Sequence, residues 1–255
     1  MTMGEERAFT GGMLFKSVLT FIFNYFLLLA IALFMVFLKQ GGDYADYLAK
    51  NLPVLFFIAG CLFLLLWIIY LYYFFEKKFF LAEIKNIWLI FLILDVCILL
   101  AFFMGNYVDV YARPVALLAL LALFLIGYRD AIFLNIVFAV TMFILDVFVE
   151  YDVYVTTGVT NGMFPSFMLT FIAGTFAVFI GKSAKTRNQI LGTGAIIALP
   201  TLAIIFLLKI SDYANFADMD TLLSLLFGFG GSLFSAVFLL AFLPIFENMF
   251  SVLTV

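Results

Sequence analysis

The sequence predicts an all-α fold, a polytopic transmembrane helical bundle of about eight spans. Hydrophobic residues make up 67% of the chain and charged residues only 11%, and the mean hydropathy is +1.25. Apolar runs close to the length that a helix needs to cross a bilayer recur along the chain. A soluble fold of 255 residues could not cover so much apolar surface with polar groups. A transmembrane barrel would show short segments of alternating hydrophobicity instead.

Polar residues divide the chain into eight expected helices. Pro53, Pro114 and Pro165 each fall in the first turn of an expected helix, where the missing N–H has no partner to lose. Pro200 falls inside the seventh helix and is expected to kink it. The helices are expected at about residues 13–38, 53–75, 87–105, 114–128, 131–149, 165–181, 190–208 and 221–243.

The first helix is predicted to be a retained anchor. Residues 13–38 are too long for the apolar core of a signal peptide and lack a small-residue cleavage site. Residues 1–52 are therefore expected to form a cytoplasmic N-terminus, the anchor helix and a short external loop. Residues 53–255 are expected to form a seven-helix transmembrane domain that ends in a cytoplasmic output segment.

The basic residues predict that both termini lie in the cytoplasm, because Lys and Arg accumulate in cytoplasmic segments. With that orientation the inner segments contain nine basic residues: Arg7, Lys16, Lys77, Lys78, Lys85, Arg129, Lys182, Lys185 and Arg187. The outer segments contain four: Lys39, Lys50, Arg113 and Lys209. The acidic residues complement this pattern, and those expected at or near the outer face are Asp43, Asp46, Asp109, Asp146, Glu150, Asp152, Asp212, Asp218 and Asp220.

The fourth expected helix is short. Residues 114–128 would reach roughly 22 Å at the helical rise, against a hydrocarbon core of about 30 Å. One interpretation is a short span extended by residues 108–113 and followed by a tight cytoplasmic turn at Tyr128-Arg129-Asp130. The other is a re-entrant hairpin, which would invert every later orientation. The first is favoured because inversion would expose the basic residues 182–187 on the outer side.

The composition leaves little for catalysis. The chain has no histidine, which removes the commonest general base and metal ligand. Cys61 and Cys97 lie inside apolar runs and give no disulfide or zinc signal. The net charge of −3 is too small to indicate a nucleic-acid partner. We therefore expect no catalytic residue, no metal site and no cofactor in this chain.

Three polar residues are candidates for an intramembrane site: Asp95, Asn24 and Asn135. A carboxylate at the centre of a span costs about 2.5–3.5 kcal/mol, so Asp95 should face the bundle interior or a cavity. It could be a proton-coupling or ligand-contacting acid. It could equally be a protonated structural acid that is hydrogen-bonded to Asn24 or Asn135. The sequence leaves both interpretations open.

The last expected helix has a face of small residues, which allow helices to approach closely in lipid. Packing within the chain is the favoured interpretation, and a homodimer interface is the alternative. The residues of this face are Gly228, Gly231, Ser232, Ser235 and Ala236.

Two segments resemble one family, the bacterial seven-transmembrane receptors with a cytoplasmic HD-type hydrolase. Residues 113–135, which begin with Arg-Pro-Val-Ala, are similar to that family's hairpin of a short helix, a polar turn and the next helix. Residues 228–254 are similar to its last helix, in which Pro244 and Glu247 precede an exit segment of an aromatic residue, Ser and apolar residues up to Thr254. The count of seven spans after residue 53 also agrees.

The resemblance implies an N-terminal anchor, a large extracellular domain, seven membrane helices and a cytoplasmic phosphohydrolase. Characterised members look like phosphodiesterases that hydrolyse cyclic di-AMP at a two-metal site of His and Asp. This chain departs from that pattern, because residues 39–52 leave no room for an extracellular domain and the metal-binding histidines are absent. We expect the membrane module only, either separated from its soluble domains or belonging to a degenerate relative.

The expected function is that of a sensory or coupling module in the bacterial cytoplasmic membrane. Its output segment, at Pro244 and Glu247, would pass a signal to a cytoplasmic cyclic di-AMP phosphodiesterase domain. The lipid bilayer, that hydrolase domain and a second copy of the chain are the expected partners, and nucleic acid is not. The alternative is a small secondary transporter or permease, which Asp95, the expected kink at Pro200 and the short fourth and fifth helices favour.

Overall fold

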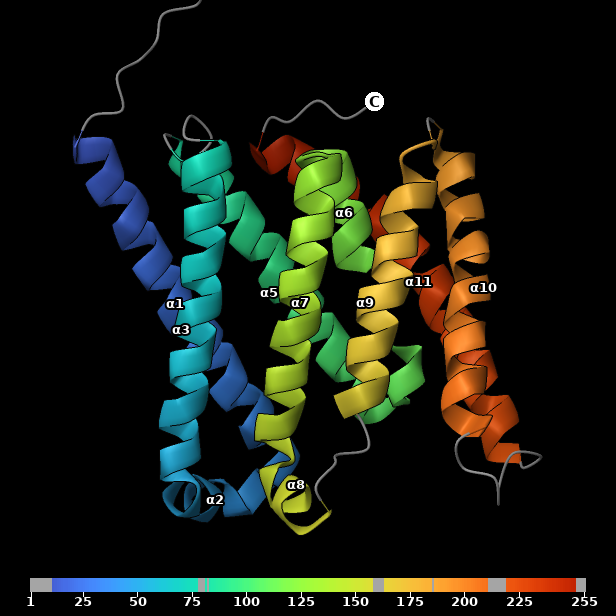
Figure 1. The fold of residues 1–255 in the computed structure, drawn as a ribbon, viewed down its shortest axis with the longest axis horizontal. Helices are drawn as coiled ribbons and strands as arrows, with labels where there is room; N and C mark the ends of the chain where they lie inside the picture. The colour runs from blue at the N-terminus through green and yellow to red at the C-terminus, as the bar shows by residue number, and fades with distance from the viewer. Residues whose placement is uncertain are drawn as a thin grey trace, which may run out of the picture.

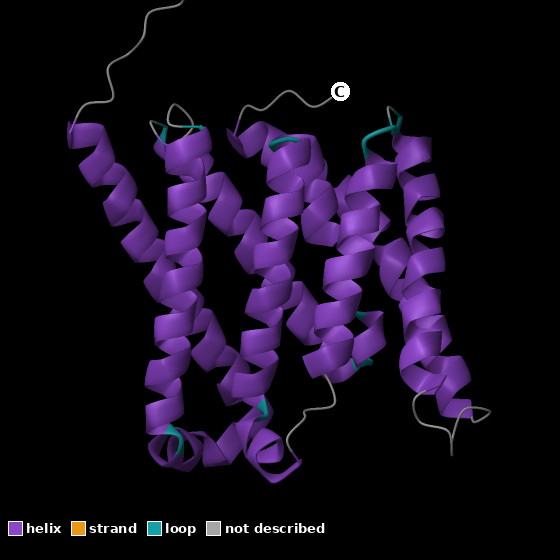
Figure 2. Cartoon of the chain, in the orientation of Figure 1, coloured by secondary structure: helices purple, strands orange, loops and turns teal. Residues whose placement is uncertain are grey.

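A computed structural model describes residues 11–77, 81, 83–157, 163–184, 186–210 and 219–250. Among these residues every regular element is a helix (Figure 2), which confirms the all-α prediction. The helices are α1 (Gly11–Gln40), η1 (Gly41–Asp43), α2 (Tyr44–Lys50), α3 (Leu52–Glu76), α5 (Ile84–Tyr107), η2 (Val110–Ala112), α6 (Leu117–Leu125), α7 (Tyr128–Val149), α8 (Tyr151–Thr157), α9 (Met163–Gly181), α10 (Arg187–Ile210) and α11 (Met219–Phe250).

Seven segments in the described part of the chain are long and apolar enough to cross a membrane: residues 14–50, α3, α5, α7, α9, α10 and α11. The segment Val110–Leu125 is apolar but shorter. The protein is therefore an integral membrane protein. The long helices alternate in direction, so that α1 begins and α11 ends at one face, which we call the terminal face (Figure 1). The short helices α2 and α8 lie at the opposite face, which we call the far face (Figure 1).

The fourth expected helix is only partly helical. Instead of a helix over residues 114–128, the structure has the 3₁₀ turn η2, a non-helical stretch and the nine-residue α6. Pro114 therefore precedes α6 and does not lie in its first turn, which corrects the prediction. The cause is local: Pro114 disfavours a helical backbone at Arg113, and Gly127, with a φ of +143°, ends the segment with a backbone that other residues rarely adopt.

The interrupted segment nevertheless crosses the bundle. It starts after α5, near the far face, and α6 ends at the terminal face beside the start of α7 (Figure 1). The crossing is inside the protein, because the α6 residues from Leu117 to Ala122 are all buried. Non-helical backbone at membrane depth is tolerated only where protein covers it. The structure thus agrees with the short-span interpretation and not with the re-entrant hairpin.

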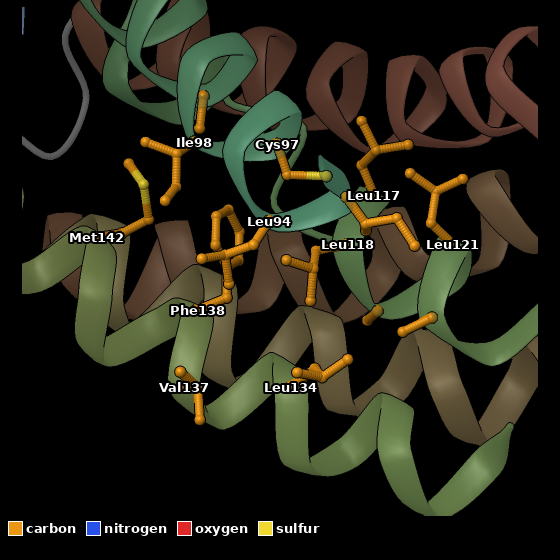
Figure 3. Packing of buried hydrophobic residues seen from close by; sticks show 14 of the residues in the cluster. Leu94, Cys97, Ile98, Leu117, Leu118, Leu121, Leu134, Val137, Phe138 and Met142 are labelled. Carbon is orange, nitrogen blue, oxygen red and sulfur yellow. The ribbon is translucent and has the colours of Figure 1, made fainter. Parts of the chain in front are cut away.

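The core lies where α5, α6 and α7 meet. Figure 3 shows Leu94, Cys97 and Ile98 of α5 directed toward Leu118 of α6 and Phe138 of α7. In α5 and α7, 61% of the apolar window is buried, against 28% in α3 and 33% in residues 14–50. Helices α1 and α3 therefore form one edge of the bundle and present most of their surface to lipid, while α10 forms the opposite edge (Figure 1).

Other boundaries differ from the prediction in informative ways. The polar triplet Tyr128-Arg129-Asp130 forms the first turn of α7 and not a loop. Helix α11 continues through Pro244 to Phe250, and α10 is helical on both sides of Pro200. The expected loop at residues 39–52 contains η1 and α2. Several residues of the prediction lie outside the described residues: Arg7, Lys78, Lys185, Asp212, Asp218 and the exit segment 251–254.

Replacement of Gly127 by Ala should destabilise the protein, because the α6–α7 turn requires a backbone conformation that is nearly exclusive to glycine. We expect a loss of about 1–3 kcal/mol, measured as a shift in the denaturant-induced unfolding of the detergent-solubilised protein. Gly192→Ala is the matched control, since a Cβ at this position in α10 meets nothing within 4 Å. Equal stability of the two variants would contradict the role of this turn.

Candidate functional site

A buried ion pair joins the interrupted crossing to α7. Arg113, between η2 and α6, donates from Nη1 to Asp146 Oδ2 at 2.6 Å and from Nη2 to Asp146 Oδ1 at 2.9 Å. Each residue is only 7% exposed. Nη1 also lies 2.7 Å from Ser166 Oγ on α9 and donates to it. A bidentate pair of this kind has the geometry that best offsets the desolvation of two charges.

The surrounding chain makes room for the guanidinium. Gly105 of α5 lies directly against it, and a Cβ added there would come within 2.8 Å of Arg113 Cζ. Asp146 is near the far-face end of α7, and Ser166 is in the first turn of α9. The pair therefore joins α5, α7, α9 and the interrupted crossing at one point near the far face. Arg113 Nε has no hydrogen-bond partner within the described part of the chain.

A small polar cavity connects this pair with the far face. It has a volume of about 40 Å³, and its walls include Arg113, Asp146, Lys39, Asn106 and Glu150. Lys39 Nζ lies 3.2 Å from Glu150 Oε1 and donates to Asn106 Oδ1 at 3.1 Å. A wider cavity of about 380 Å³ shares Lys39 and Glu150 with it. The small cavity exceeds the volume that one water molecule needs, so water or a small polar group can reach the buried pair.

The last helix packs directly on the turn that carries Arg113. A Cβ added to Gly231 of α11 would lie 2.8 Å from the carbonyl oxygen of Arg113 and 2.9 Å from that of Ala112. No residue other than glycine fits here unless the turn or the helix moves. The backbone of α11 is thus in contact with the backbone that holds the guanidinium.

The rest of the small-residue face packs within the chain, against α10. Gly228 faces Thr201 and Ile205, and Ser232 Oγ lies 3.0 Å from Thr201 Oγ1. Ala236 faces Gly194, where an added Cβ would come within 2.7 Å of the Ala236 Cβ. Ser235 donates to the carbonyl oxygen of Gly231 at 2.9 Å, on its own helix.

The expected output residues lie in the last two turns of α11. Pro244 is exposed and Glu247 is half-buried, while Phe246 between them is buried. A row of phenylalanine rings, one per turn, continues past Pro244. Successive rings of this row are 6.0 to 6.3 Å apart, and its members are Phe234, Phe238, Phe242, Phe246 and Phe250.

Asp95 lies on α5, one turn after Phe91. It is 5% exposed, and neither carboxyl oxygen has a hydrogen-bond partner in the described residues. The rings of Phe21 and Phe91 are 4.9 Å apart and fix the register of these two parallel helices. From this register we infer that Asn24 and Asp95, one turn further along, face the same interface. Asn24 donates to the carbonyl oxygen of Thr20 at 2.8 Å, and its own oxygen has no partner. The buried side-chain oxygens of both residues therefore have no hydrogen-bond partner in the described part of the chain.

Asn135 belongs to a different interface. Its amide nitrogen donates to the carbonyl oxygen of Phe171 at 3.3 Å and to Thr175 Oγ1 at 3.4 Å, both on α9. Gly174 leaves space for it, since an added Cβ would lie 2.6 Å from Asn135 Cγ. The three intramembrane candidates are therefore not brought together: Asn24 and Asp95 share one interface, and Asn135 bridges α7 and α9.

A third buried carboxyl group lies at the terminal face. Asp130, in the first turn of α7, is 1% exposed and lies 2.6 Å from Lys77 Nζ. An acidic residue at this position also interacts favourably with the N-terminal end of the helix dipole. From the sequence, Asp130 was expected in a turn, Arg113 in an outer segment, and Asp146 at or near the outer face. In both the Lys77–Asp130 and the Arg113–Asp146 pairs, opposite charges near the ends of neighbouring apolar segments could have indicated an ion pair.

Across the residues that the structure describes, no three side chains of His, Cys, Asp or Glu come together in a way that could hold a metal ion. The polar groups near the far face are suited to hydrogen bonding and charge pairing. Their arrangement is therefore suited to binding a small polar group or to a change of helix packing.

Comparison with known proteins gives one family. Residues 51–254 match the family model described as "7TM receptor with intracellular HD hydrolase". The match covers α3 to α11, which make seven crossings when the interrupted segment is counted, and it leaves α1 outside. Neither a comparison with curated proteins nor one with solved structures found a match.

Removal of either partner of the buried pair should be strongly destabilising, because it leaves the other charge uncompensated inside the protein. We expect Arg113→Ala and Asp146→Ala each to cost about 3–5 kcal/mol, measured by denaturant titration in detergent. The double variant should cost less than the sum of the two single variants.

The exposed pair Lys50–Asp152, with side chains 70% and 47% exposed, is the matched control. Its removal should cost about 0–1 kcal/mol. If the effects at the two pairs were similar, the buried pair would not be an anchor of the bundle.

Proposed function

Because the chain belongs to the family of 7TM receptors with an intracellular HD hydrolase, we propose that it is the membrane module of such a receptor. It passes a signal across the bacterial cytoplasmic membrane to an HD-type phosphodiesterase that hydrolyses cyclic di-AMP. The module contributes no catalytic residue of its own. The hydrolysis would belong to the cytoplasmic HD domain of the receptor.

The basic residues support an orientation with the terminal face in the cytoplasm. Among the described residues, those in segments at the terminal face are Lys16, Lys77, Lys85, Arg129, Lys182 and Arg187. Those in segments at the far face are Lys39, Lys50, Arg113 and Lys209. The excess at the terminal face is the distribution that cytoplasmic segments have. Helix α11 would then deliver its output on the side where the hydrolase is expected.

The observation that carries the proposal is the contact of Gly231 with the Arg113 turn. We expect a signal at the far face that changes the Arg113–Asp146 pair to shift this turn as well, because the turn carries Arg113. The turn cannot move toward α11 without displacing it, since their backbones already touch. Helix α11 continues unbroken to Phe250, so the displacement reaches the terminal face. We infer that the bundle has two packings, one with α11 in its present position and one with α11 displaced, and that these are the two states of the receptor.

Gly231→Leu in the whole receptor, as its gene encodes it, should change cyclic di-AMP hydrolysis because the larger side chain pushes α11 away from the turn. A typical coupling energy corresponds to a change of about 5-fold or more in the hydrolysis rate of isolated membranes. Gly230→Leu is the control, since an added Cβ there has only the Phe234 ring within 4 Å, at 3.9 Å.

Equal rates for the two leucine variants at equal membrane levels would contradict the coupling path. The wider proposal would fail if the gene ended at Val255 and no HD hydrolase associated with the module.

A transporter is the second candidate, favoured by the unpaired buried carboxyl of Asp95 and by the interrupted crossing, since broken helices and intramembrane acids mark many transport sites. Uptake into liposomes driven by a proton gradient separates the two functions. A transporter would lose uptake with Asp95→Asn and would keep it with Gly231→Leu. A receptor module would show no uptake with either.

A further inference from the structure

A groove lies between α3 and α7 near the far face. It has a volume of about 480 Å³, and its walls are formed mainly by Val54, Phe57 and Cys61 of α3 and by Phe143 and Ile144 of α7. We call it the α3–α7 groove. It is separate from the polar cavity beside Arg113, which α7 borders through Asp146 and Val149.

The groove runs from the membrane interface into the hydrocarbon region. Pro53, at its outer end, is in the first turn of α3, and Cys61 lies eight residues further along the helix, which corresponds to roughly 12 Å of depth. Phe57, on its wall, is 71% exposed. Because α3 and α7 both have the length and composition of membrane-spanning helices, the material that meets this opening is the acyl region of the bilayer.

The outer end of the groove has the chemistry of a headgroup region. Tyr151 and Tyr154 of α8 form part of its wall, and tyrosine is typical of the boundary between acyl chains and water. The position of α8 is fixed by α2: Tyr47 donates to the carbonyl oxygen of Phe148 at 2.6 Å, and the Tyr151 N–H donates to Tyr47 Oη at 3.2 Å. Both tyrosines are therefore held where the groove opens.

A basic residue lies close to this opening, because it contacts Asp152, the neighbour of Tyr151 on α8, although it does not itself line the groove. Lys50, the last residue of α2, precedes Pro53 by three positions, and its side chain is 70% exposed. Its contact with Asp152, at 3.2 Å, is an exposed pair. Such a pair contributes little to stability, so a phosphate can compete for the ammonium group.

We propose that the α3–α7 groove binds one acyl chain of a phospholipid from the far-face leaflet, with its phosphate at Lys50. An empty apolar groove of this size would leave its walls without packing partners, and an acyl chain is the apolar material available at this depth. A polar ligand would not fit, because the deep walls contributed by Phe57, Ile58, Phe143 and Ile144 have no side-chain donor or acceptor. This site does not depend on the proposed receptor function.

The first test counts retained lipid. The purified full chain is delipidated, exposed to dioleoylphosphatidylglycerol and analysed by native mass spectrometry. The native sequence should retain one phospholipid, and Ile144→Trp, which fills the groove, should retain none. Leu64→Trp is the matched control, since Leu64 is on α3, is 60% exposed and does not line the groove. Equal retention by the two tryptophan variants would mean annular lipid only and would overturn the proposal.

The second test separates the two sources of an acyl chain. Lys50→Glu should reduce retention of the phospholipid about as strongly as Ile144→Trp does, while retention of oleic acid should be unchanged. If Lys50→Glu had no effect on the phospholipid while Ile144→Trp removed it, the groove would bind acyl chains without reading the phosphate, and that part of the proposal would be wrong.

The third test locates the chain and does not depend on any variant. A phosphatidylglycerol with a photoactivatable acyl chain is incorporated with the protein into bilayer nanodiscs and irradiated, and the adducts are mapped by peptide sequencing. They should concentrate on residues 53–61 and 143–154, and excess unlabelled phospholipid should suppress them. Adducts spread evenly over all lipid-facing helices would contradict a defined site.

Discussion

The Arg113–Asp146 pair is the constraint around which the bundle is organised. A guanidinium at the margin of the hydrocarbon region needs a partner of opposite charge, and a bidentate carboxylate with an added hydroxyl supplies it. That arrangement is possible only because the fourth crossing is non-helical at this position and because Gly105 leaves space. Gly231 then brings α11 onto the same turn. This one interaction accounts for three features of the sequence. The fourth crossing is not helical at Arg113, glycines occupy the facing positions 105 and 231, and α11 lies in close contact with the turn.

The interrupted crossing is energetically tolerated because protein, and not lipid, surrounds its backbone. Helix α6 is too short to span a bilayer, and the four residues before it form no regular helix. In lipid, each backbone group of this stretch without a local partner would cost several kcal/mol. Here α5, α7, α9 and α11 all pack against the crossing. The long helices thus enclose the weakest element of the fold, and the site of charge pairing is placed inside it.

The sequence predicts the membrane-spanning helices well because hydropathy is a property of each segment alone. It predicts the fourth helix poorly, because whether a short apolar run is helical at membrane depth depends on what covers it. Asp95 was expected to face the interior, and it does, but its neighbours depend on the register of α1 against α5. The small face of the last helix was recognisable by residue type. Its contact with the Arg113 turn was not, since those residues are far apart in the chain. Arg113 and Asp146 were treated as external charges because each is close to the end of an apolar run.

The phenylalanine row along α11 has a mechanical consequence. A proline inside a helix removes one hydrogen bond and normally creates a point of bending. In α11 the rings of Phe242 and Phe246 span the turn that contains Pro244, with their centroids 6.3 Å apart, and they resist closure of the helix on that side. We therefore expect the end of α11 to move as a rigid helix and not to bend at Pro244. A displacement of α11 near Gly231 would then rotate or tilt the whole helix as far as Phe250. A domain that is rigidly attached to the end of the helix would rotate or tilt with it.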